Sequence, residues 1–83
     1  MKAEVYTKSE ITEMITRQYG SYSQDIINYI INGLIDLSDE EVMREFTKAS
    51  QGSLISKVEN GFLVEFVNVN TFLSELWLDL ASN

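Results

Sequence analysis

The chain changes its hydrophobic period in its C-terminal half, and this change limits the folds it can adopt. Two runs rich in β-branched and aromatic residues, 54–58 and 62–66, flank Asn60-Gly61, a dipeptide typical of β-hairpin turns. Over 8–49 and again over 71–80, apolar residues recur at the spacing of amphipathic helices. The sequence therefore predicts an α+β fold with three N-terminal helices, an antiparallel β-hairpin and a C-terminal helix. Residues 2–6 alternate weakly and are a candidate edge strand joined to the hairpin.

Helix-start signals place the first and third helices. Thr7 and Ser38 each begin a capping box, which Glu10 and Glu41 complete three residues later. Gly20 follows the first helical segment, where we expect left-handed backbone to end the helix. In this interpretation the capping chemistry alone explains the residues from Ser38 to Glu41.

The second and fourth helices are the most apolar. Ser21 or Ser23 caps the second, and Asn68 or Asn70 caps the fourth. The second is apolar over more than half its circumference, which predicts a central helix buried on more than one side. Gly33 within it predicts a closely packed neighbour, because glycine costs about 1 kcal/mol relative to alanine inside a helix. The apolar side of the fourth is Phe72, Leu73, Leu76, Trp77 and Leu80, with Leu78 off this stripe.

Two registers fit the hairpin. A two-residue turn pairs Glu59 with Phe62, whereas a type I turn with a glycine bulge pairs Val58 with Phe62. We predict the bulged turn, because it places the apolar residues on one face and Lys57 and Glu65 on the other. Its other pairs are Ser56 with Val64 and Leu54 with Phe66. Ile55 and Leu63 then lie on the outer face and, with Leu78, are candidates for a dimer or partner surface.

Length and composition predict a single compact domain over residues 1–83. The 83 residues include no cysteine and no histidine, so neither a disulfide nor a cysteine–histidine zinc site can stabilise the fold. Stability must come from apolar packing, for which a hydrophobic content of 45% is sufficient. The chain shows no signal-peptide pattern and no apolar run near the roughly 20 residues of a membrane span. We therefore expect a cytoplasmic protein that does not bind membranes.

The missing residue types also exclude most catalytic chemistry. Without histidine and cysteine, serine–histidine hydrolysis and cysteine nucleophiles are impossible. Paired carboxylates need a cleft for which a domain of this size has little room. The segment 37–42 has the composition of a helix entering an EF-hand, but the calcium loop is absent. We predict no enzymatic activity, no cofactor and no metal.

Charge is the remaining functional signal. Thirteen acids face six bases, which gives a net charge of −7. A magnitude of about 2 to 8 is ordinary for a small domain and by itself only keeps it soluble. It nevertheless disfavours direct binding to nucleic acid, which requires clustered lysine and arginine. Five acids fall within ten residues: Asp36, Asp39, Glu40, Glu41 and Glu45.

These observations predict a binding protein whose partner has a basic surface, such as a nucleic-acid-handling protein that the chain inhibits. The predicted contact residues are Asp36, Asp39, Glu40, Glu41, Glu45 and Glu65. In size, acidity, mixed α/β content and lack of catalytic residues, the chain resembles the small anti-defence proteins of phages, anti-CRISPR proteins included. No residue motif carries this resemblance, so it transfers no functional residue. Two alternatives stay open: a transcriptional regulator with winged-helix-like element order, and an adaptor that forms a homodimer.

Overall fold

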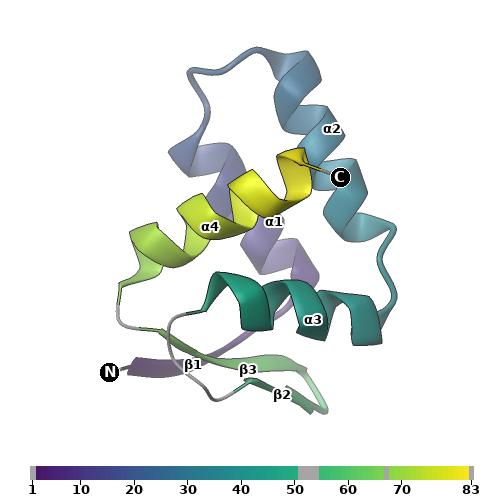
Figure 1. Ribbon diagram of the computed structural model, residues 1–83, viewed down its shortest axis with the longest axis vertical. Helices are drawn as coiled ribbons and strands as arrows, with labels where there is room; N and C mark the ends of the chain where they lie inside the picture. The colour runs from purple at the N-terminus through teal and green to yellow at the C-terminus, as the bar shows by residue number, and fades with distance from the viewer. Residues whose placement is uncertain (1, 51–54, 67, 83) are drawn as a thin grey trace.

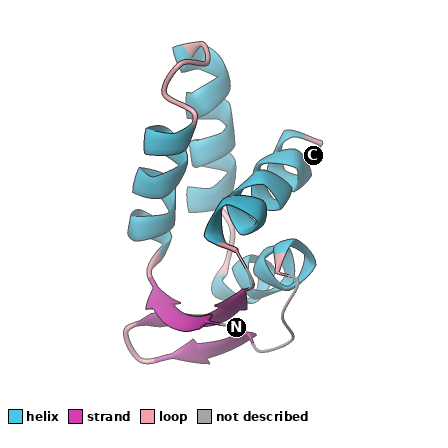
Figure 2. Ribbon diagram, turned by 90° about the vertical axis from the view of Figure 1, so that its left-hand side faces the viewer, coloured by secondary structure: helices cyan, strands magenta, loops and turns pink. Residues whose placement is uncertain are grey.

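The computed structural model describes residues 2–50, 55–66 and 68–82, and these form four helices and a three-stranded antiparallel sheet. In chain order the elements are β1 (Lys2–Tyr6), α1 (Lys8–Gln18), α2 (Gln24–Ile35), α3 (Asp39–Ala49), β2 (Ile55–Val58), β3 (Gly61–Phe66) and α4 (Val69–Ala81). The sheet order is β1-β3-β2, so the predicted N-terminal strand exists and lies at an edge. The helices lie on one side of the sheet, with α1 and α2 forming an antiparallel pair (Figures 1 and 2).

The predicted caps are present. The side chains of Thr7 and Ser38 accept hydrogen bonds from the amides of Glu10 and Glu41, which return bonds to the cap amides. Ser23 rather than Ser21 caps α2, and Asn68 caps α4. The prediction that left-handed backbone at Gly20 ends α1 was wrong. The C-cap of α1 is Tyr19, with φ −111°, and among the described glycines it is Gly61, not Gly20, that has a positive φ. Local side-chain bonding to the backbone thus explains where all four helices begin.

The core lies between the sheet and α3 and continues between the helices. Phe46 on α3 contacts the rings of Phe62 and Phe72 edge-on, with both centroid distances at 5.5 Å. The remaining fully buried large side chains come from α1, α2, α3, α4 and β3, and they are Ile11, Ile15, Ile27, Ile30, Leu34, Val42, Val64 and Leu76. Every helix therefore contributes to one core, as a domain without a disulfide or zinc site requires.

The second helix was predicted to be the central one, but the central helix is α4. α4 packs against α1, α2 and α3, and all five residues of its predicted stripe are buried. In α2, only Ile27, Ile30 and Leu34 are buried. Ile26, Tyr29 and Ile35 are each about half exposed, at 47%, 58% and 51%. The isoleucine-rich sequence predicted burial on several sides, but α2 packs against α1 and α4 and leaves its outer side exposed.

Both hairpin registers considered above were wrong. The observed register pairs Val58 with Gly61 and Lys57 with Phe62, so Glu59 and Asn60 form the turn. Gly61 belongs to the strand, at φ +148°, and a Cβ there would lie 2.5 Å from the carbonyl oxygen of Tyr6. The approach of β1 therefore decides the register, and a hairpin considered without its third strand cannot reveal it.

The register shift also changes which residues share a face. Phe62 and Val64 are buried as predicted, but Lys57 lies on their side, with its Nζ 5.3 Å from the centre of the Phe62 ring. Leu63 pairs with Val5 on the outer face, as expected. The predicted pairing of Leu54 with Phe66, and the side chain of Ile55, lie outside the described residues; Phe66 pairs with Lys2 of β1.

Candidate protein-binding surface

Four of the predicted acids lie together where α2 ends and α3 begins. Asp36 is the C-cap of α2, and Asp39, Glu40 and Glu41 form the first turn of α3. All four side chains are exposed. The sharp turn at Leu37 and Ser38 thus collects carboxylates from two helices on one corner of the molecule, which we call the acidic corner: Asp36, Asp39, Glu40 and Glu41.

Glu41 has a structural role within this corner. Its carboxylate accepts a hydrogen bond from the Ser38 amide at 3.1 Å, and the Ser38 hydroxyl accepts one from the Glu41 amide at 3.2 Å. The bonds from the backbone and side chain of Ser38, together with the charge of Arg44, hold the pKa of Glu41 below its usual range. The side chains of Asp36, Asp39 and Glu40 take no part in the capping box.

The structure separates the other two predicted contact acids from the corner. Glu45 is buried, at 8% exposure, and one carboxylate oxygen is 3.5 Å from Lys48 Nζ. Its placement among outward acids of the third helix was therefore wrong, because it lies on the side of α3 that carries Val42 and Ala49. Glu65 is on the central strand, and its carbonyl accepts a bond from the hydroxyl of Ser50, the C-cap of α3. The length of α3, roughly 16 Å, separates that end from Asp39.

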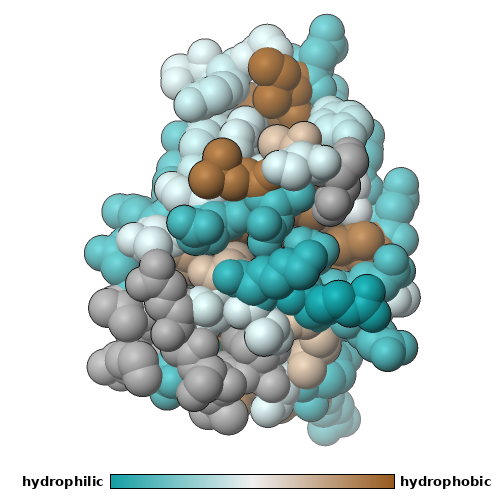
Figure 3. Space-filling model, viewed as in Figure 1, coloured by the Kyte–Doolittle hydropathy of each residue, from teal (hydrophilic) through white to brown (hydrophobic). Residues whose placement is uncertain are grey.

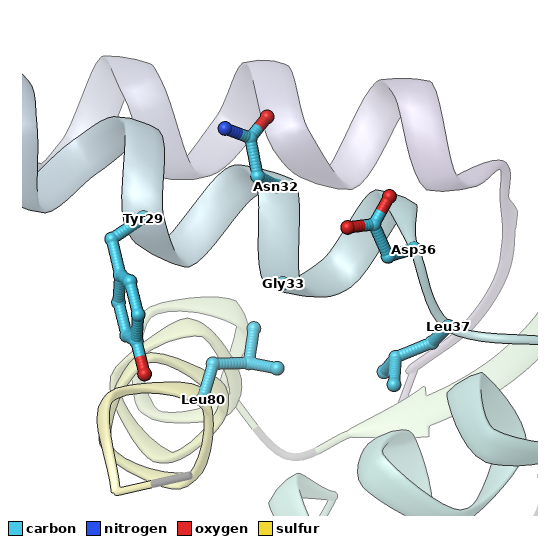
Figure 4. Close-up of a pocket in the computed structure, with 6 residues that line it drawn as sticks. All are labelled: Tyr29, Asn32, Gly33, Asp36, Leu37 and Leu80. Atoms are coloured by element: carbon cyan, nitrogen blue, oxygen red, sulfur yellow. The ribbon is translucent and has the colours of Figure 1, made fainter.

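A groove adjoins the acidic corner, and sequence reasoning missed it. It lies between α2 and the C-terminal end of α4 and has a volume of about 380 Å³. Its lining residues are Tyr29, Asn32, Gly33, Asp36, Leu37 and Leu80. In Figure 4, Leu80 points from α4 toward α2, and the Tyr29 ring extends from α2 over the end of α4. The groove thus has an apolar floor with Tyr29 at one end and Asp36 at the rim of the other, where the carboxylate projects from α2 on the side away from Leu80 (Figure 4).

Gly33 keeps this groove open. A Cβ at Gly33 would have no heavy atom within 4 Å, so the predicted close neighbour inside the fold does not exist. A helical glycine that no intramolecular contact requires is a position where another chain can approach the backbone. Two sequence signals mark the groove: this glycine and the apolar outer residues of α2. In the sequence analysis both signals predict burial of α2.

The two helices that form the groove carry acids and no base. α2 contains one charged residue, Asp25, and α4 contains two, Glu75 and Asp79, so neither helix carries a base. A lysine from α1 adjoins the groove: Lys8 Nζ donates to the carbonyls of Ile35 at 3.1 Å and Leu37 at 2.7 Å. Lys8 therefore serves the backbone at the end of α2, where carbonyls lack helical partners.

The apolar surface beside the acids is divided into patches. Figure 3 shows separate hydrophobic patches surrounded by hydrophilic residues on the face that carries α3 and α4. The exposed large apolar residues are Ile26, Tyr29 and Ile35 on α2 and Leu78 on α4. Apolar contacts enclosed by charged ones are the usual composition of a protein interface.

One ionisable side chain outside this surface has a strongly shifted pKa. The Tyr6 hydroxyl donates to Glu4 at 2.7 Å within β1, and burial together with this bond raises the pKa of Tyr6 well above its usual range. Within the part of the chain that the structure describes, no three acidic, histidine or cysteine side chains are grouped so that they could hold a metal, and no helix is long and apolar enough to cross a membrane. Comparison with protein-family models, with curated proteins and with solved structures gives no match.

Proposed function

We propose that this domain is a binding protein that recognises a basic surface on a protein partner and acts by covering it. The observation that carries the proposal is the charge distribution: four exposed acids form the acidic corner at the C-terminal end of α2, and neither α2 nor α4 contains a base. A partner surface that binds nucleic acid is basic by necessity. A domain presenting carboxylates next to apolar side chains competes for such a surface.

Local rather than global charge supports this proposal. Duplex DNA carries one charge per roughly 1.7 Å of its axis, so a domain 32 Å long needs about nineteen negative charges to imitate it along its whole length. Thirteen acids minus six bases fall short of that density. Four exposed acids on one corner are enough to fill an arginine-rich pocket. We therefore propose blockage at one pocket or groove of the partner, in the manner of a small inhibitor.

The charge of α3 disfavours the DNA-binding alternative. In a winged-helix arrangement the third helix enters the major groove. Here the first turn of α3 carries Asp39, Glu40 and Glu41, all exposed. These carboxylates would meet the phosphates, so the same residues that favour a basic protein partner oppose contact with DNA.

The test uses two variants of equal net charge. The corner variant is Asp36→Asn/Asp39→Asn/Glu40→Gln, and the control is Glu13→Gln/Asp25→Asn/Glu59→Gln, in which all three acids are also exposed. Wild type and both variants are immobilised and challenged with lysate of the source cells, and retained proteins are identified and purified. We expect a partner retained by wild type and the control but lost from the corner variant, with affinity falling steeply as salt rises.

The inhibitory part of the proposal has its own measurement. Fluorescence anisotropy of a labelled nucleic acid bound to the purified partner should fall when wild-type domain is added, because both compete for one basic surface. Equal retention by the two variants would contradict the role of the acidic corner. A gel shift of free duplex DNA by the domain at low salt would overturn the proposal and favour a regulator that binds DNA itself.

A further inference from the structure

The groove between α2 and α4 contains an apolar floor and a carboxylate within one site. Leu37 and Leu80 contribute aliphatic side chains, and Gly33 leaves the α2 backbone accessible between them. Asp36 lines the same groove and is exposed, and the Tyr29 ring borders it. At about 380 Å³ the groove is at the small end of ligand pockets, which span about 300 to 1,000 Å³, so it fits single side chains rather than a large ligand.

This combination matches one type of side chain. Arginine and lysine carry an aliphatic stem that packs on apolar surface and a cation that remains polar. A carboxylate at the rim of an apolar groove satisfies the cation. We propose that the groove receives an arginine from a basic amphipathic helix of the partner, with the stem on Leu37 and Leu80 and the guanidinium on Asp36.

The surroundings of the groove define the rest of the partner segment. Ile26 precedes Tyr29 and Gly33 on one side of α2, at the three- and four-residue spacing of a single helical stripe. A helix lying along this stripe would place apolar residues on Ile26 and Tyr29, as helix-in-groove recognition requires. The acids nearest in the fold are Asp79 on α4 and Asp39 and Glu40 at the start of α3, whereas Lys8 is bonded to the carbonyls of Ile35 and Leu37. They favour further basic residues on that helix.

A second copy of this chain is a poorer occupant. A symmetric dimer through this groove would place the same surface of both copies together. Asp36 and the acids of α3 and α4 would then meet their own counterparts, in a chain whose net charge is −7. Like charges in direct opposition oppose association. Charge complementarity thus selects a basic partner over self-association.

The inference rests on the proposed function, and a synthetic probe tests it without the natural partner. The probe is a peptide of about 15 residues, long enough to form a helix, with two leucines and a central arginine on one face and lysines elsewhere. A peptide of identical composition in scrambled order is its control. Binding is followed through backbone amide chemical shifts, and we expect the largest changes at Gly33, Leu37 and Leu80.

Three variants locate the interaction. Gly33→Leu fills the groove, and because a Cβ there meets open space the variant should fold; it should weaken probe binding by more than about tenfold. Asp36→Asn should weaken binding by about tenfold, the usual size of a lost charge-assisted hydrogen bond. Glu59→Gln removes an equal charge from the hairpin turn and should leave binding unchanged.

The outcomes separate this inference from the proposed function. If the probe binds wild type and Gly33→Leu equally, or the shifts map to α1 or the sheet, the groove assignment is overturned while recognition of basic partners stands. If neither peptide binds at low salt, both proposals are overturned. If sedimentation shows a wild-type dimer that Gly33→Leu dissociates, the occupant is a second copy and the basic-helix assignment is overturned.

Discussion

α4 and α2 are both rich in large apolar side chains, but the fold uses them in different ways. α4 lies among the other three helices and buries Phe72, Leu76 and Trp77, the last stacked on Tyr19 with ring centroids 4.0 Å apart. α2 buries one stripe and leaves Ile26 and Tyr29 about half exposed. Apolar content alone therefore does not distinguish a core helix from one that presents a surface. The number of neighbours a helix has makes that distinction.

The largest expected effect is a loss of stability on truncating a buried residue of α4, compared with an exposed residue of α2. Leu76→Ala should lower the free energy of unfolding by about 2 to 5 kcal/mol, because Leu76 is fully buried on α4. Ile26→Ala should change it by about 0.5 kcal/mol or less, because Ile26 is half exposed. Urea denaturation of both variants measures the difference. Similar losses would mean that the outer side of α2 is as well packed as α4.

The next prediction concerns how the C-terminal end of α2 is held. Lys8 bridges the first turn of α1 to the last carbonyls of α2, so Lys8→Met should cost about 1 to 2 kcal/mol. Lys57→Met is the matched control, because it removes the same charge but loses a bond to the adjacent Val58 carbonyl and a contact with the Phe62 ring, neither of which joins two helices. In thermal unfolding, Lys8→Met should have a clearly lower melting temperature than the control. Equal stability would show that packing alone fixes this end of α2.

A smaller effect is expected where α3 begins, directly after α2. Ser38→Ala should cost about 1 kcal/mol, because it removes the cap of α3. It should also move the pKa of Glu41 back toward its ordinary value near 4.5, because the Ser38 side-chain bond helps lower it. Carboxylate titration by NMR checks this shift. An unchanged Glu41 pKa would mean that the backbone bond from residue 38 and the charge of Arg44 account for the shift without the serine hydroxyl.

The same group gives a pH dependence of defined sign. Because the pKa of Glu41 is lower in the folded chain than in the unfolded chain, its carboxylate favours folding above its ordinary pKa. That contribution is lost as pH falls through the folded value. The stability difference between wild type and Glu41→Gln should therefore be larger at neutral pH than in acid. A difference independent of pH would contradict the capping role of the charge.

The smallest expected effect is a gain. Gly33→Ala should raise the free energy of unfolding by roughly 0.5 to 1 kcal/mol, because alanine is the better helix former and its Cβ meets open space. Chemical denaturation checks it. A loss of stability would show that the groove beside Gly33 is closed in solution, and it would remove the basis for docking a partner there.

The acidic surface shows how far sequence reasoning reaches toward a site. Asp36, Asp39 and Glu40 were predicted as contact residues, and the structure places them together because the caps of α3 follow α2 without a linker. Glu45 was indistinguishable from them in sequence, yet it is buried. The groove residue Leu80 comes from the other end of the chain, so no local pattern could bring it beside Gly33.

The sequence by itself determined where the helices begin, that a hairpin follows them, and that histidine and cysteine chemistry is absent. These features depend on side chains within a few residues of the backbone groups they serve, such as Ser38 with Glu41. Only the tertiary structure decided that α4 is central and that Gly61 lies in a strand against Tyr6. It also decided that α2 keeps an open groove. These outcomes depend on packing between segments distant in the chain, where burial competes between surfaces that look equally apolar in sequence.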